Sequence, residues 1–102
     1  MEIRNDIPNL LAMYIRNTRE IYDITTWLHD ILIKKINNGV QPQVEHLANC
    51  STMKSIIREA AKLLYKYDGI TPTKQEKQEA AQEHAKYILE SVQYFIQNAN
   101  RG

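Results

Sequence analysis

The residues best suited to chemistry in this chain lie in the sequence EHLANC, where His46 and Cys50 are four positions apart. On a helix this spacing places both side chains on one face, where they could begin a metal site. A structural zinc ion needs four ligands, and the sequence has no second pair of the CxxC or HxxxH type. His29 and His84 would have to converge from other segments. We therefore predict no metal and no cofactor, and we interpret Cys50 as a small buried residue at a helix junction.

Catalytic chemistry is not predicted either. A nucleophile pair of Cys50 and His46 would need an orienting third group and an oxyanion pocket, and the sequence lacks the Gly-rich motifs that usually build one. Glu76, Glu79 and Glu83 follow one helical face, but lysines interleave with them, which is typical of an exposed helix with salt bridges. We expect a protein that is not an enzyme and has no small-molecule substrate.

A third group of residues is basic. Lys54, Arg58, Lys62 and Lys66 recur every four residues, so on a helix they form one stripe roughly opposite the apolar side. Like charges at this spacing repel each other mildly, and an anionic partner would relieve the repulsion. A solvated helix face is the simplest interpretation, and the others are a contact for nucleic-acid phosphates or for an acidic protein.

The segment LANCSTMKSIIREAAKLL, residues 47–64, resembles the recognition helix of LuxR-type regulators and of sigma factor region 4. The likeness rests on a helix cap, the residues after it and a closing pair: Ser51, Thr52, Met53, Lys54, Lys62 and Leu63. In those families a longer turn separates this helix from the preceding one. Here only Asn49 and Cys50 stand between Ala48 and Ser51, so we do not assign the chain to either family.

The segments that position these residues have helical periodicity. Gly39 and Gly69 are each followed by a proline three residues later, and both clusters are typical helix stops. In the long segments that these clusters separate, apolar residues recur at three- and four-residue steps. The pattern predicts an all-α, single-domain, up-down bundle of three to four helices with long first and last helices. The expected helices span about 7–37, 42–49, 52–67 and 74–98, with the first either continuous or broken near 23–26, where threonines lower the helix propensity.

Capping residues indicate where these helices begin. Asp6 and Ser51 are suitable N-caps, and the sequence Thr73-Lys74-Gln75-Glu76 matches a capping box. The helix after Ser51 carries a predicted core stripe of Met53, Ile56, Ile57, Ala60, Ala61, Leu64 and Tyr67. The first half of the last helix offers only alanines for burial. We expect that half to project beyond the core or to pack lightly through Ala81 and Ala85.

Composition sets the broad class. The chain has 102 residues, of which 43% are hydrophobic and 25% charged, and its net charge is +1. These values predict one globular domain over residues 1–102 and give no general attraction to membranes or nucleic acid. The start MEIRNDIPN lacks the apolar region of a signal peptide, and a single cysteine allows no intrachain disulfide. We expect a cytoplasmic protein, or one in the host cytoplasm if a phage encodes it.

The aromatic content points to binding. One Trp and six Tyr are many for a small bundle, and such residues are favoured at interfaces. We expect a small non-enzymatic protein that acts by protein–protein interaction with a partner or with a second copy, as in a bacterial or phage accessory or inhibitor protein. The alternative is a nucleic-acid-binding module that uses the stripe at 54–66. The candidate partner-binding residues are Lys54, Arg58, Lys62, Lys66, Trp27 and Tyr65.

Overall fold

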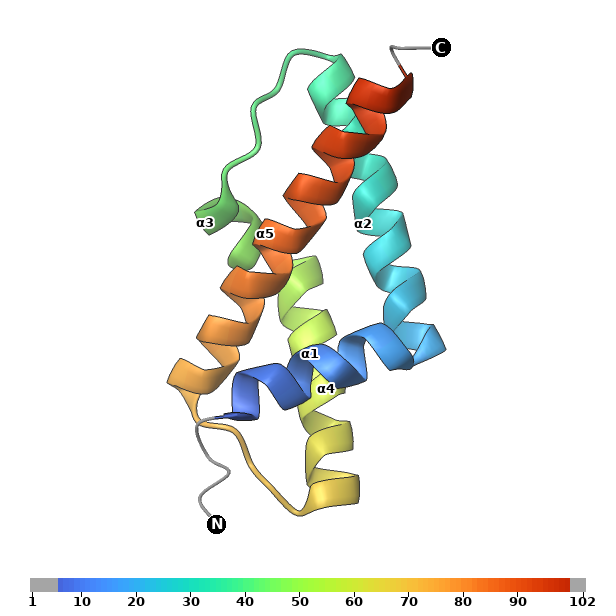
Figure 1. Cartoon of the computed structure of the whole chain (residues 1–102). Helices are drawn as coiled ribbons and strands as arrows, with labels where there is room; N and C mark the ends of the chain where they lie inside the picture. Colours follow the sequence, from blue (N-terminus) through green and yellow to red (C-terminus); the bar gives the residue numbers. More distant parts are fainter. Residues whose placement is uncertain (1–5, 100–102) are drawn as a thin grey trace.

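Five helices and no strand make up residues 6–99, the part of the chain that the computed structural model describes. The helices are α1 (Ile7–Asn17), α2 (Arg19–Asn37), α3 (Val44–Ala48), α4 (Ser51–Asp68) and α5 (Lys74–Ala99). The prediction of an all-α fold is confirmed. Figure 1 shows α2, α4 and α5 running roughly along the long axis, while α1 crosses in front of α4. The molecule measures 48 × 23 × 23 Å.

The first predicted helix is in fact two helices, and the break lies at Thr18 instead of near 23–26. Thr18 is extended, with φ −109° and ψ 115°, so the chain changes direction there and α1 can pack on α4 and α5. Residues 23–26 stay helical, and their two threonines are accommodated within α2. The Thr26 hydroxyl donates to the Tyr22 carbonyl at 3.1 Å, and Thr25 is buried. The expectation of a long first helix was wrong.

The cap of α4 also differs from the prediction. The helix begins at Ser51, and its N-cap is Cys50, whose Sγ accepts a hydrogen bond from the Met53 backbone N–H at 3.4 Å. The predicted cap at Ser51 was therefore wrong by one residue, because the cysteine sulfur takes the accepting role of a hydroxyl. At its other end α4 stops at Gly69, whose φ of 66° is the left-handed conformation that favours glycine.

The other two predicted caps have different outcomes. The capping box of α5 is confirmed, since the Thr73 N–H donates to Glu76 Oε1 at 2.7 Å and the Glu76 N–H donates to Thr73 Oγ1 at 3.1 Å. Asp6 occupies the N-cap position of α1, but its side chain makes no capping hydrogen bond. The start of α5 is therefore held by its own side chains.

The core follows the predicted stripe of α4 except at Ala61, which is only partly buried, and at its last residue. The stripe is buried at Met53, Ile56, Ile57, Ala60 and Leu64. Tyr67 was expected in the core but is 65% exposed, because the last turn of α4 extends past the crossing with α1 (Figure 1). Its ring stacks on Tyr14 with centroids 6.3 Å apart, and the Tyr14 hydroxyl donates to Asp68 Oδ2 at 2.6 Å. This hydrogen bond raises the pKa of Tyr14 to about 12.

The first half of α5 packs instead of projecting beyond the core. Ala80, Ala81 and Ala85 are buried, and α3 and α1 lie against α5. Because alanine is small, neighbouring helices can approach closely at these positions. The second half buries larger residues, which are Ile88, Leu89 and Val92.

Candidate binding surfaces

The predicted basic stripe of α4 is exposed, but its residues face two different hollows. Lys54 and Arg58 line a groove between α4 and α5, whereas Lys62 and Lys66 line a hollow between α4 and α2 that Arg58 also borders. Lys62 is paired with Glu59, with Nζ 3.1 Å from Oε2. The Lys66 ammonium lies 5.3 Å from the centroid of the Tyr67 ring. The second half of the stripe therefore already has partners within the chain.

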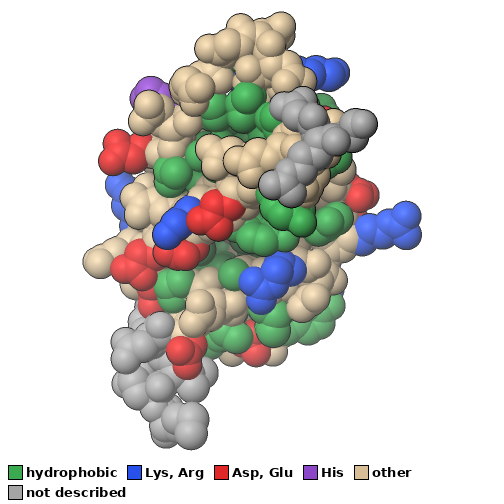
Figure 2. Space-filling model, turned by 45° about the horizontal axis from the view of Figure 1, so that its top comes forward, with side chains coloured by type: hydrophobic (Ala, Val, Ile, Leu, Met, Phe, Trp, Pro, Cys, Tyr) green, Lys and Arg blue, Asp and Glu red, His purple; other side chains and the backbone are tan. Residues whose placement is uncertain are grey.

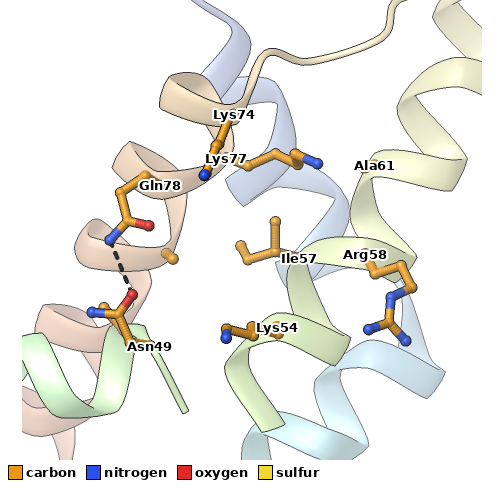
Figure 3. Close-up of a pocket in the computed structure, with 10 residues that line it drawn as sticks. Asn49, Lys54, Ile57, Arg58, Ala61, Lys74, Lys77 and Gln78 are labelled. Carbon is orange, nitrogen blue, oxygen red and sulfur yellow. Dashed lines mark hydrogen bonds between the residues drawn. The ribbon is translucent and has the colours of Figure 1, made fainter. Parts of the chain in front are cut away.

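The groove between α4 and α5 brings together four cations, and we call it the basic groove. Lys54 and Arg58 come from α4, and Lys74 and Lys77 come from the first turn of α5. Its volume is about 340 Å³. Figure 3 shows Lys77 extending from α5 toward α4, while Lys54 extends the opposite way. Sequence reasoning found Lys54 and Arg58 but missed Lys74 and Lys77, because only the fold places the two helices side by side.

The lining of the basic groove contains no acidic side chain. Within residues 6–99, no ion pair joins any of its four cations to an Asp or Glu. Its apolar lining consists of Ala48, Ile57, Ala61 and Ala81. At the α3 end the Gln78 side-chain amide donates to Asn49 Oδ1 at 3.4 Å (Figure 3). The groove is thus positively charged, apolar within and bounded by an amide pair at one end.

A second surface lies where α2 meets the later part of α5. Its members are Tyr22, His29, Tyr87, Tyr94 and Phe95, and we call it the aromatic face. The His29 and Phe95 rings meet edge to face at 6.0 Å, and His29 Nε2 lies 3.3 Å from Ser91 Oγ. A hollow of about 220 Å³ runs between Tyr22 and Tyr87, and no Asp, Glu, Lys or Arg side chain lines it. Tyr94 follows Tyr87 by two helical turns and shares its side of α5.

A buried histidine lies behind this face. His84 Nε2 is 3.1 Å from the Thr25 hydroxyl, and the His84 ring stacks on Tyr87 at 6.1 Å. Burial lowers the pKa of His84 to about 4, and the positive charge of Arg16 contributes in the same direction. His84 is therefore neutral near pH 7. The sequence signal was its position one residue before the buried Ala85, together with Thr25 on the apolar side of α2.

Trp27 and Tyr65, the two aromatic candidates from the sequence, lie apart from the aromatic face. Trp27 is 56% exposed and borders a hollow of about 420 Å³ formed by α2, the segment 40–43 and α3, which His46 and Cys50 also line. Tyr65 is 64% exposed on α4 and does not line the basic groove. Figure 2 shows one side of the molecule, on which hydrophobic side chains reach the surface between charged ones. The structure thus does not gather the six predicted residues into one site.

Comparison with protein-family models, with curated proteins and with solved structures gives no match. Among residues 6–99, no three His, Cys, Asp or Glu side chains converge as metal ligands do. No helix in that part of the chain is both long and apolar enough to cross a membrane.

Proposed function

We propose that the protein acts by binding another protein through the aromatic face. The observation that supports this is the exposure of four large aromatic side chains, two of which, Tyr22 and Tyr87, line a hollow without Asp, Glu, Lys or Arg. Tyr22, Tyr87, Tyr94 and Phe95 are each more than half exposed, and Tyr94 is the most exposed at 69%. Aromatic side chains at a protein surface are favoured anchors because they bury much apolar area and lose little conformational entropy on binding.

The charges beside the aromatic face favour a foreign partner over a second copy. Four exposed acids lie one helical position or one turn from members of the face, and these are Asp23, Asp30, Glu83 and Glu90. Two exposed bases, Arg19 and Lys86, lie at the same spacing, so the rim carries a net negative charge. A symmetric dimer through this face would bring the two acidic rims together, and like charges across an interface oppose association. We therefore propose a partner that presents an apolar anchor within a basic surrounding.

This role is one of binding and requires no catalytic residue. It fits an accessory or inhibitor protein, bacterial or phage-encoded, that works in the cytoplasm or in the host cytoplasm. A homodimer, the other possibility expected from the sequence, is distinguished from a foreign partner by the mass of the cross-linked adduct. The nucleic-acid alternative depends on the basic stripe and is independent of the aromatic face.

The test places a photo-reactive amino acid at Tyr94 and, as a matched control, at Tyr65, which is similarly exposed on another helix. In the native host we expect a cross-linked protein adduct from position 94 and none from position 65. Adding Tyr87→Ser and Phe95→Ser should abolish the adduct at 94, while circular dichroism shows an unchanged fold. Nuclease treatment should have no effect, and light scattering should report a monomer for the purified protein.

Three results would contradict the proposal. An adduct with twice the mass of the chain would show that the face binds a second copy. Equal cross-linking from positions 94 and 65 would show that the contact is not specific to the aromatic face. Loss of the adduct after nuclease treatment would show that nucleic acid bridges the contact.

A further inference from the structure

We propose that the basic groove is a binding site for an organic phosphate of about mononucleotide size. The site is distinct from the aromatic face and does not depend on the function proposed for it. A volume of about 340 Å³ lies at the lower end of the range for small-molecule sites, roughly 300–1,000 Å³. A ligand of this size fits the groove, and the chemistry of the lining indicates its class.

The charges of the groove call for an anion. Lys54, Arg58, Lys74 and Lys77 surround one concavity that no Asp or Glu lines. Lys62, on the same helix, shows the contrasting case, because its ammonium is already paired with Glu59. A phosphate offers several strong acceptor oxygens, and arginine and lysine are the side chains that bind it by charge-assisted hydrogen bonds. Binding would replace repulsion among the four cations with attraction to one ligand.

The positions of two lysines indicate where a phosphate would lie. Lys54 and Lys77 reach toward each other's helix from opposite walls, and Ile57 lies between them (Figure 3). Lys74 extends into the same space from the start of α5, and Arg58 lies toward the rim. A single phosphate group above Ile57 would therefore face cations from both helices.

The rest of the lining suits a ligand larger than an inorganic ion. Ile57, Ala61 and Ala81 give an apolar surface on which a flat or apolar group can pack. At the α3 end, the Asn49 and Gln78 amides are joined to each other, and the Asn49 amide also donates to the Glu45 carbonyl at 2.8 Å. These contacts fix both amides beside the apolar surface, where they offer neutral polar atoms to a base or sugar.

The positive end of α5 is not what makes this site. The capping box already satisfies the Glu76 N–H through Thr73, and the Glu76 carboxylate lies against the Thr73 N–H. An anion in the groove would therefore depend on the lysine and arginine side chains. Replacing those side chains should remove binding while leaving the helix start intact.

A small phosphate ester fits the arrangement better than a nucleic-acid strand. A strand offers a row of phosphates and needs a matching row of cations. The stripe of α4 does not supply one, because Lys62 and Lys66 face the hollow with α2 and contact Glu59 and Tyr67. The four cations of the groove instead surround one concavity.

The test measures binding of four probes by calorimetry: pyrophosphate, adenosine monophosphate, adenosine triphosphate and a short DNA duplex. The groove variant combines Lys54→Gln with Lys77→Gln, and the matched control combines Lys62→Gln with Lys66→Gln, which removes the same charge outside the groove. We expect saturable binding of the nucleotides, which the groove variant weakens by about tenfold or more and the control changes by less than about twofold. NMR shifts on nucleotide addition should centre on the Ile57 and Ala61 methyl groups.

Several outcomes would overturn the proposal. They are the absence of saturable nucleotide binding, an equal loss in both double variants, and NMR shifts away from Ile57 and Ala61. Binding of pyrophosphate as tight as that of adenosine triphosphate would reject the nucleotide-sized ligand. Tighter binding of the duplex, weakened equally by both double variants, would replace the proposal with a nucleic-acid surface along the whole stripe.

Discussion

The two halves of α5 belong to one continuous helix, yet they build opposite kinds of surface. The first half buries Ala80, Ala81 and Ala85, against which neighbouring helices pack closely. Its first turn carries Lys74 and Lys77, which line the basic groove together with Ala81. The second half buries larger side chains that fill the core, and its aromatic residues remain at the surface. The two halves thus differ both in the size of the residues that they bury and in the exposed side chains that they carry, which are lysines at the start of the helix and aromatic residues in its later part.

The largest expected effect on stability comes from removing a large buried side chain in the second half of α5. Ile88 is 1% exposed, so Ile88→Ala removes packed apolar volume and leaves a cavity. We expect it to lower the free energy of unfolding by about 3 kcal/mol. Ala81→Gly in the other half removes one methyl group and should cost about 1 kcal/mol, mainly through helix propensity. Urea unfolding of both variants checks the difference, and equal losses would break the comparison between the two halves.

Acid should weaken the junction between the halves through His84. Burial lowers the pKa of His84 from 6.5 to about 4, so between these values the unfolded chain binds more protons than the folded one. The stabilisation from the neutral ring is complete above pH 6.5 and falls as the pH falls toward 4. The lowered pKa corresponds to a loss of about 3 kcal/mol across that window.

Urea unfolding at pH 7 and pH 4 measures this loss, with His84→Gln as the control. The glutamine amide can still meet the Thr25 hydroxyl, but it does not titrate in this range. The variant should lose distinctly less stability on acidification than the natural protein, and what remains reports the carboxylates. The same pH dependence in both proteins would show that His84 does not control acid stability.

Much of the fold was predictable because it depends on local patterns. The capping box at Thr73, the stop at Gly69 and the apolar stripe of α4 each follow from a few neighbouring residues, and the structure has all three. The break at Thr18 was not predictable in this way. If residues 7–37 formed one helix, Thr18 would lie on its apolar side. The pattern of apolar residues is therefore the same whether the helix continues through Thr18 or ends there. Only the packing of α1 across α4 and α5 distinguishes them.

The binding surfaces were predictable only in part, for the same reason. Spacing along α4 identified Lys54 and Arg58 but could not show that Lys74 and Lys77 lie across from them. It also grouped Lys62 and Lys66 with the first pair. Each four-residue step turns slightly more than one full helical turn, so the stripe winds gradually around α4. The sequence does not show that its two halves face different neighbouring helices. Spacing also predicted that Tyr67 lies in the core. It is exposed because the last turn of α4 extends past its crossing with α1 (Figure 1).

The smallest predicted effect is that replacing two different lysines changes the stability of the ligand-free protein in opposite directions. Lys62→Gln removes the exposed ion pair with Glu59 and should destabilise the fold by about 0.3 kcal/mol. Lys77→Gln removes one of four neighbouring cations that no acid in the groove offsets, so it should stabilise the fold by about as much. Both effects should shrink in high salt, because exposed charges are screened.

Paired urea titrations at low and high salt would resolve this difference. If both variants lose stability equally, the cations of the groove are no more strained than the rest of the stripe, and the contrast between the two halves of α5 is one of packing alone. Opposite signs that converge in salt would mean that the folded chain keeps an unfavourable cluster of charge at one place. A protein retains such a cluster at a cost to its own stability, and the occupant that would offset the cost is an anion.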